Sequence, residues 1–221
     1  MEDVEINREE VLRYLGHRNQ KLDDKLVGTV EECVEEIKRI ASPKYIFKTF
    51  LITAREPEIS LKNGLFELPG KEISRHLAGA CECILMAATL GFEVDKKIRY
   101  YEKIDLAKAM ILDACATAYI EEVCDRVCKD IEKDGIPQGK SLTGRFSPGY
   151  GDLPIQIQKG FLDVLDAGKR IGLTASSTNI LMPRKSVTAV LGIVDESCGK
   201  VQSGCSVCSK RNECAYKRRS I

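Results

Sequence analysis

The segment GIPQGKSLTGRFSPGYGDLP, residues 135–154, has a glycine or proline every few residues. This spacing predicts an irregular, turn-rich loop. Pro148 fixes φ, Gly149 permits a tight or left-handed turn, and Tyr150 follows with an amphipathic side chain. Arg145 lies five residues before Tyr150, where its guanidinium could face a carboxylate. The loop is therefore a candidate site for a zwitterionic small ligand, and the alternative is a structural turn with a packed tyrosine and a solvated arginine.

The segment before this loop carries a long helical pattern from Asp105 to Asp134. Asp105 can cap the helix and Gly135 can end it, which makes it about 28 residues long. Its predicted core face has residues at helical spacing: Met110, Ala114, Thr117, Ile120, Cys124, Val127 and Ile131.

The rest of the chain mixes helical and strand patterns. Two capping signals, Asn7 with Glu10 and Thr29 with Glu32, predict two N-terminal helices. Asn63-Gly64 predicts a hairpin over residues 59–68. Further predicted elements are strands over 45–52, 173–181 and 186–194, a short helix over 72–77 and a helix over 152–167. The continuous apolar run 81–89 is interpreted as a buried strand, with a buried helix as the alternative, because periodicity alone does not separate the two. This order predicts an α+β domain on an antiparallel or mixed sheet.

Composition excludes several classes of protein. The 221 residues are 43% hydrophobic and 30% charged, as in ordinary soluble globular proteins. Thirty-four basic residues balance thirty-three acidic ones, so the chain has no large net charge that would attract it to nucleic acid or to a membrane surface. The longest apolar run, 83–90, cannot span a bilayer, and the acidic N-terminus is no signal peptide. We therefore expect a cytoplasmic protein without membrane partners.

Four of the ten cysteines lie close together near the C-terminus: Cys198, Cys205, Cys208 and Cys214. Their spacing, with one C-x-x-C, is typical of metal ligands, and the alternative is four incidental thiols. Zinc would form a structural knuckle, whereas an iron–sulfur cluster would carry one electron. Basic residues flank these cysteines: Lys210, Arg211, Lys217, Arg218 and Arg219. They either form a solvated end of the chain or bind an acidic partner. Nucleic acid is disfavoured, because Tyr216 is the one aromatic residue of the tail.

The loop motif R-x-x-P-G-Y is followed by a predicted helix, a Leu-Thr-x-Ser stretch, Met-Pro, and Ser-Val at the start of an apolar strand. This combination resembles the S-adenosylmethionine-binding activation domain of cobalamin-dependent methionine synthase. The resemblance is specific over residues 145–194 and looser upstream, at 89–91 and 118–126. The residues that carry it are Arg145, Pro148, Gly149, Tyr150, Leu173 to Ser176, Met182-Pro183 and Ser186-Val187.

The resemblance implies a C-shaped α+β domain over residues 1–195, with a twisted antiparallel sheet and flanking helices. Residues 196–221 would then be a separate cysteine-rich metal-binding tail. S-adenosylmethionine would bind at Arg145, Ser147, Pro148, Gly149 and Tyr150. Arg145 would hold the methionine carboxylate, backbone groups of the loop would hold the adenine and ammonium ends, and Tyr150 would face the corrin.

Two features depart from the family pattern. No carboxylates that would assist the loop are evident upstream, where Gly139 and Thr117 fall at the expected places. The adjacent tyrosine pair after the final strand is also missing. These departures make S-adenosylmethionine binding weak or dependent on a docked partner.

By the same resemblance, the expected function is reactivation of a cobalamin-dependent methionine synthase on a separate chain. The reaction would be reductive methylation of cob(II)alamin with S-adenosylmethionine, and a flavodoxin or ferredoxin-type protein could donate the electron. One alternative is an activator of another corrinoid methyltransferase. Another is a metal-binding adaptor protein without a methyl-transfer role. The chain shows no catalytic dyad of its own, since His17 and His76 lie far apart in sequence and outside the motif.

Overall fold

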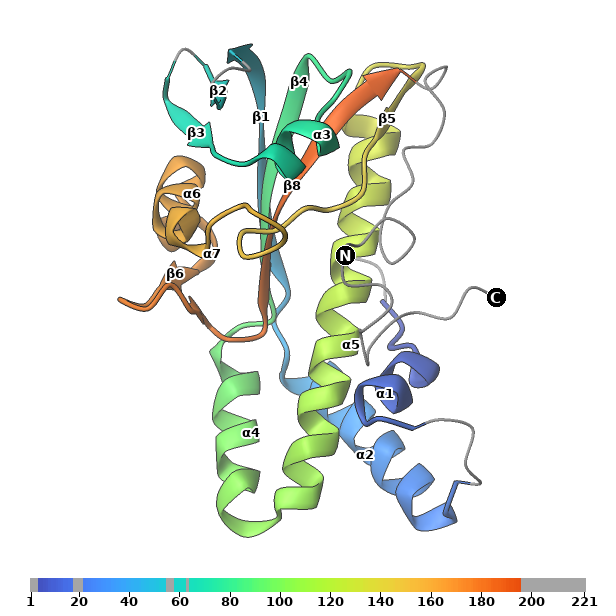
Figure 1. Ribbon diagram of the computed structural model, residues 1–221. Helices are drawn as coiled ribbons and strands as arrows, with labels where there is room; N and C mark the ends of the chain where they lie inside the picture. The colour runs from blue at the N-terminus through green and yellow to red at the C-terminus, as the bar shows by residue number, and fades with distance from the viewer. Residues whose placement is uncertain (1–3, 18–21, 55–57, 63, 196–221) are drawn as a thin grey trace.

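The computed structural model describes residues 4–17, 22–54, 58–62 and 64–195. Its centre is an antiparallel sheet with the strand order β3-β2-β1-β4-β8-β5 (Figure 1). A separate small hairpin pairs β6 with β7. The bounds are β1 Lys44–Ala54, β2 Ile59–Leu61, β3 Phe66–Leu68, β4 Glu82–Thr89, β5 Lys140–Leu142, β6 Thr174–Ala175, β7 Leu181–Met182 and β8 Ser186–Asp195.

Helices cover both faces of this sheet. On one face α5 Leu106–Asp130 packs against β4 and β8, and three further helices pack against α5: α1 Arg8–Tyr14, α2 Asp24–Ile40 and α4 Phe92–Ile104. The other face packs against α3 Lys71–His76, α6 Gln158–Leu165 and α7 Ala167–Ile171. In Figure 1 the sheet fills the upper half of the molecule, and α4 with the first half of α5 extends below it. The predicted α+β class, with a twisted antiparallel sheet and flanking helices, is confirmed.

The central strand β4 explains why two cores form. Its side chains are buried on both faces, so alternate residues enter different clusters. Ile84, Met86 and Ala88 pack toward α5. Cys83, Leu85 and Ala87 pack toward α6 and α7. A continuous apolar run is what a strand covered on both faces requires, and the predicted strand over 81–89 is confirmed.

The long helix α5 begins where its cap predicts. The Asp105 carboxylate accepts a hydrogen bond from Lys108 N at 3.0 Å, so the predicted cap is confirmed. After Asp130 the chain adds one wider π-helical turn, Ile131–Gly135. Met110 was predicted on the core face, but this prediction is wrong: its side chain is 60% exposed on the outer side of the helix.

Two predicted boundaries are also wrong. The helix predicted to begin at Thr29 begins at Asp24, and Asp23 caps it through Lys25 N. Thr29 lies inside the helix, where its hydroxyl donates to Lys25 O at 2.9 Å. Residues 173–181 are not one strand, because a turn at 176–180 divides them into β6 and the start of β7. The Asn7 cap, the hairpin over 59–68, the short helix over 72–77 and the last strand are confirmed.

Within the described ranges, no helix is long and apolar enough to cross a bilayer.

Candidate functional site

The loop between β5 and α6 is attached to the last strand at two points. Phe146 and Val190 exchange two backbone hydrogen bonds, at 3.0 and 2.8 Å. Thr143 N donates to Gly192 O, and the Thr143 hydroxyl accepts from Gly192 N at 2.8 Å. A Cβ on residue 192 would lie 3.2 Å from the Thr143 side chain, so glycine lets the loop approach the strand closely. The loop therefore has a fixed position on the sheet.

The tip of the loop is a tight turn that displays Tyr150. Tyr150 N donates to Ser147 O at 3.0 Å, and Gly149 N donates to Leu153 O at 2.8 Å. Gly149 has a φ of +91°, a conformation that glycine adopts without steric cost. Pro148 is buried, Ser147 is half-buried, and the Tyr150 side chain is 62% exposed. The predicted rigid turn with an outward tyrosine is confirmed in its geometry.

Asp152 attaches the end of the loop to α3, a helix 80 residues away in the sequence. Its carboxylate accepts from Lys71 N at 2.6 Å and from Glu72 N at 3.0 Å. These are unpaired N–H groups of the first helical turn, which a carboxylate stabilises. The two backbone donors lower the pKa of Asp152 against the opposing effect of desolvation. Asp152 therefore caps α3, and not the following helix that it was predicted to start.

His76, at the end of α3, packs beneath the same loop. Its Nε2 lies 2.8 Å from Gly144 O, an atom that can only accept, so Nε2 carries a proton. The Thr143 hydroxyl is 2.9 Å from the same nitrogen, and the ring lies 5.1 Å from the ring of Phe146. Burial lowers the pKa of His76, because the charged imidazolium loses solvation. No role was predicted for His76, and the structure places it as a support of the loop.

Arg145 points from the loop onto α5. Its Nη2 lies 2.6 Å from Glu121 Oε2, and its Nη1 lies 2.6 Å from Asp125 Oδ1. The guanidinium side chain is 18% exposed, whereas the two carboxylate side chains are 30% and 40% exposed. The arginine therefore lies beneath two carboxylates that solvent and a ligand can reach. We call Arg145, Glu121 and Asp125 the ion-pair cluster.

The two carboxylates of this cluster were not predicted as site residues. They lie one helical turn apart, which places them on the same face of α5. Acidic residues within a mostly apolar helix were a signal for them, but neither is near the loop in sequence. The tertiary packing of α5 beside the loop brings them to Arg145.

The predicted metal ligands, Cys198, Cys205, Cys208 and Cys214, lie outside the described residues. Among the residues that the structure does describe, no group of three or more histidine, cysteine or acidic side chains could hold a metal ion. The described cysteines are free thiols, and burial raises the pKa of Cys33 to about 11 and that of Cys115 to about 12. These two are core residues and not reactive groups.

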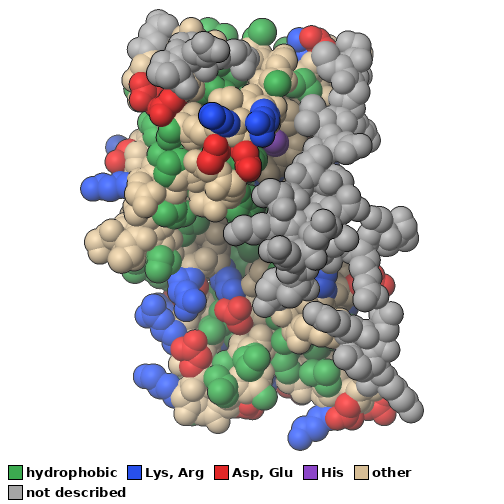
Figure 2. Space-filling view, viewed as in Figure 1, with side chains coloured by type: hydrophobic (Ala, Val, Ile, Leu, Met, Phe, Trp, Pro, Cys, Tyr) green, Lys and Arg blue, Asp and Glu red, His purple; other side chains and the backbone are tan. Residues whose placement is uncertain are grey.

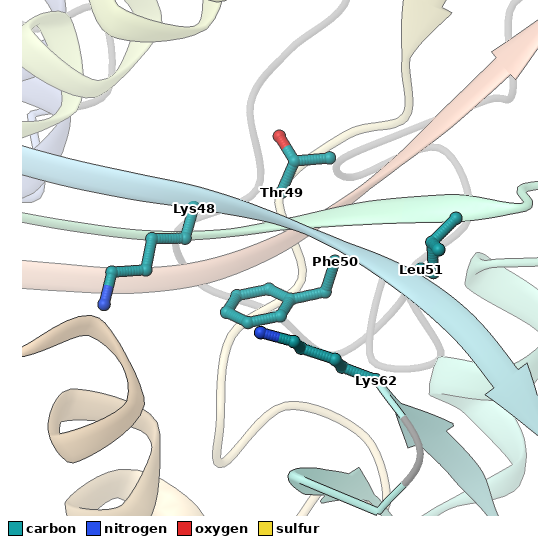
Figure 3. Close-up of a pocket in the computed structure, with 5 residues that line it drawn as sticks. All are labelled: Lys48, Thr49, Phe50, Leu51 and Lys62. Atoms are coloured by element: carbon teal, nitrogen blue, oxygen red, sulfur yellow. The ribbon is translucent and has the colours of Figure 1, made fainter.

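An open pocket on β1 is separate from the loop (Figure 3). It lies where β2 ends and β1 continues beyond it. Its lining residues are Lys48, Thr49, Phe50, Leu51 and Lys62. Lys48 already donates to Val164 O at 2.8 Å, and no residue of the loop or of the ion-pair cluster lines this pocket.

The class that the fold defines is an α+β domain whose curled antiparallel sheet carries helices on both faces. No protein-family model and no curated protein matches the sequence. Thirteen chains of solved structures match the fold. One is the crystal structure of the MetH reactivation domain bound to AdoHcy, with a TM-score of 0.58 and 12% sequence identity. The match covers 78% of this chain and 67% of that chain, so this chain has the fold of that reactivation domain.

Proposed function

We propose that this chain reactivates a cobalamin-dependent methionine synthase on a separate polypeptide by presenting S-adenosylmethionine to its corrinoid. The observation that carries the proposal is a loop that holds Arg145 of the ion-pair cluster and the exposed Tyr150, in a fold shared with a reactivation domain bound to AdoHcy. The reaction we propose consumes one electron and one methyl group. Cob(II)alamin plus an electron and S-adenosylmethionine gives methylcobalamin and S-adenosylhomocysteine.

The charges of the cluster match this ligand. One guanidinium and two carboxylates give a net charge of −1, and S-adenosylmethionine carries a carboxylate, an ammonium and a sulfonium, for a net charge of +1. A guanidinium has five N–H donors, and the ion pairs of Arg145 with Glu121 and Asp125 use two of its nitrogens, which leaves donors for a ligand carboxylate. In this proposal, Arg145 binds the methionine carboxylate while Glu121 and Asp125 bind the ammonium.

The loop backbone supplies the rest of the proposed site. Ser147, Pro148 and Gly149 form a turn whose position is fixed by the bonds to β8 and α3. A preorganised turn loses little entropy when a ligand binds. Tyr150, at the exposed tip, would face the corrin of the partner and exclude water there. The chain would act by positioning and electrostatics, and the corrinoid would carry the chemistry.

The cysteine tail belongs to the same proposal. Cys198, Cys205, Cys208 and Cys214 would hold an iron–sulfur cluster or zinc, and a cluster would give the chain its own one-electron route. Otherwise a flavodoxin or ferredoxin-type protein would supply the electron. The absorption spectrum of anaerobically purified protein separates these cases. A visible band that bleaches with dithionite supports the cluster, and a colourless protein that contains zinc rules it out.

Reconstitution tests the main proposal. Oxidised, cobalamin-loaded methionine synthase is mixed with S-adenosylmethionine and a reductant, with and without this chain, and recovery of methylcobalamin is followed by its spectrum. A related corrinoid methyltransferase in a parallel reaction tests the alternative client. The proposal requires that recovery with methionine synthase depends on the chain, and equal recovery without it would refute the function.

Calorimetry tests the site itself. Arg145→Ala should weaken S-adenosylmethionine binding by about 2–3 kcal/mol, because it removes hydrogen bonds to a charged group. Arg126→Ala is the matched control, since Arg126 lies on α5, the helix that carries Glu121 and Asp125, but pairs with Asp130. Unchanged affinity in the Arg145 variant would contradict the assigned role.

A further inference from the structure

One face of α4 carries a row of exposed side chains. Phe92, Lys96, Arg99 and Lys103 recur at spacings of four, three and four residues, so they lie on one side of the helix. All four side chains are exposed, whereas Val94 and Ile98 of the same helix are buried. We call these four residues the α4 stripe. The stripe has one aromatic ring and three cations, and Lys96 pairs with the neighbouring Glu93.

The turn that follows β7 is held rigidly above this helix. Arg184 N donates to the Asp95 carboxylate at 2.7 Å. Lys185 Nζ donates to Thr117 Oγ1 and pairs with Asp113 Oδ1, both at 2.8 Å. The turn is thus tied to α4 through a backbone group and to α5 through a lysine. The side chain of Arg184 takes no part in this attachment and is exposed.

Arg99 and Arg184 line one small groove together with Asp95, Asp113 and Lys185. Both carboxylates in this groove are already bonded, one to the Arg184 backbone and one to Lys185. Within the part of the chain that the structure describes, no acidic side chain pairs with either guanidinium. The two arginine side chains therefore line the same groove, and neither of them pairs with the carboxylates there.

Exposed apolar residues continue this surface toward the end of the helical hairpin. Met110 is 60% exposed, Leu106 is 64% exposed, and Met182, next to the rigid turn, is 40% exposed. Arginine, methionine and aromatic residues are enriched in protein–protein interfaces. Figure 2 shows several Lys and Arg side chains along α4 and at its upper end, with Asp and Glu side chains among them, on the face turned to the viewer. A mixed cationic and apolar surface fits a protein partner better than a small anion.

We propose that the α4 stripe and Arg184 dock an acidic surface of the corrinoid-carrying protein. This inference rests on the proposed function, which identifies the corrinoid-carrying protein as the partner. The net charge of the chain is only +1, so the local excess of cations does not follow from overall composition. Opposite charges at the rim of an interface steer encounter and fix orientation. Docking on this face would set the direction from which the corrin approaches the loop.

A charge-reversal pair tests the docking surface. Arg99→Glu with Arg184→Glu should leave the fold intact, because neither side chain holds the structure together and Arg184 contributes its backbone N–H. Lys25→Glu with Lys129→Glu is the matched control, reversing two exposed cations on α2 and on α5. The probe is the cobalamin-loaded methionine synthase used for reconstitution, with its binding to each variant measured by interferometry at low and high salt.

The Arg99/Arg184 variant should bind that partner about tenfold more weakly at low salt, and the difference should shrink as salt screens the charges. The lysine control should bind like the wild type, and both variants should bind S-adenosylmethionine normally. Equal partner affinity and equal salt dependence in the arginine variant would overturn the docking surface while the proposed function stood. Failure of the wild-type chain to bind or reactivate the partner would overturn both. If the double variant misfolds, Arg184→Ala and Arg99→Ala, each made alone, replace it in the same comparison.

Discussion

Replacing Asp152 with alanine would remove the side-chain link between α3 and the loop that carries Arg145 and Tyr150. The carboxylate accepts two backbone hydrogen bonds, from Lys71 N and Glu72 N, at the unpaired end of a short helix. Loss of a capping side chain costs about 0.5–2 kcal/mol. Bonds to a charged acceptor are stronger than average, but Asp152 is exposed, so solvent offsets part of the gain. We expect a destabilisation of about 1.5 kcal/mol.

Urea denaturation followed by circular dichroism measures this loss. In thermal melts of a domain of this size, a destabilisation of about 1.5 kcal/mol should lower the Tm by roughly 3–6 °C. Asp152→Asn keeps one acceptor oxygen and should lose less. Asp163→Ala is the matched control, because this exposed aspartate of α6 makes no described side-chain bond, and it should change stability by less than about 0.5 kcal/mol.

The dependence on pH is part of the same prediction. The backbone donors lower the pKa of Asp152 in the folded state, against desolvation, from an ordinary value of 3.8. The contribution of Asp152 to stability is therefore complete above the pKa that the residue has in the unfolded chain, and it is lost as the pH falls through the pKa of the folded state. The difference in free energy of unfolding between wild type and Asp152→Ala should be the same at about pH 7 and about pH 5, and it should disappear below about pH 4. An alanine variant as stable as the wild type at neutral pH would refute the role of Asp152 as a cap.

Three further predictions concern stability. Burial lowers the pKa of His76 below its ordinary 6.5, so the folded state favours neutral His76, and its contribution to the free energy of unfolding is lost as the pH falls through 6.5 toward the folded pKa. The urea midpoints of wild type and His76→Gln should therefore differ less at about pH 5 than at about pH 7.5. An equal difference between the midpoints at both pH values would contradict this. Thr188→Val removes the hydroxyl that accepts a hydrogen bond from the buried Gln158 amide at 2.7 Å, and this should lower stability by about 1–3 kcal/mol. In a double-mutant cycle, adding Gln158→Leu should restore much of this loss, because no unpaired amide is then buried. Gly151→Ala should cost about 1–2 kcal/mol in thermal melts, because its φ of +52° disfavours a side chain and the Glu72 carboxylate would have to move away from the new Cβ. A variant as stable as the wild type would argue against that loop conformation.

The sequence predicts those elements whose signals are local. Asn7 and Asp105 cap the helices that they were expected to cap, and the apolar run of β4 is a buried strand. Thr29 misled the prediction because its hydroxyl, which can cap a helix, can also bond the preceding turn from within one. Met110 matched the helical period of the core, but the elements that pack on α5 leave its side of the helix uncovered.

The candidate site was predicted only in part, for the same reason. The Arg145–Tyr150 turn depends on the conformations of Pro148 and Gly149, which sequence reveals directly. The partners of Arg145 lie on α5, 20 and 24 residues before it in the sequence, and the support from His76 comes from an element earlier still. Such contacts arise from packing, and no spacing rule within the loop encodes them.

The position of β8 has a consequence for how the protein is made. It is the last described strand in chain order, yet it lies between β4 and β5 in the sheet. It contributes Ala189, Leu191 and Ile193 to one core and Val190 to the other. During synthesis, neither core can close until residues 186–195 have emerged, and the loop waits for Val190 and Gly192 before it is anchored. A nascent chain would therefore expose both apolar faces of β4 until this strand arrives, which makes late synthesis the period of greatest risk of aggregation.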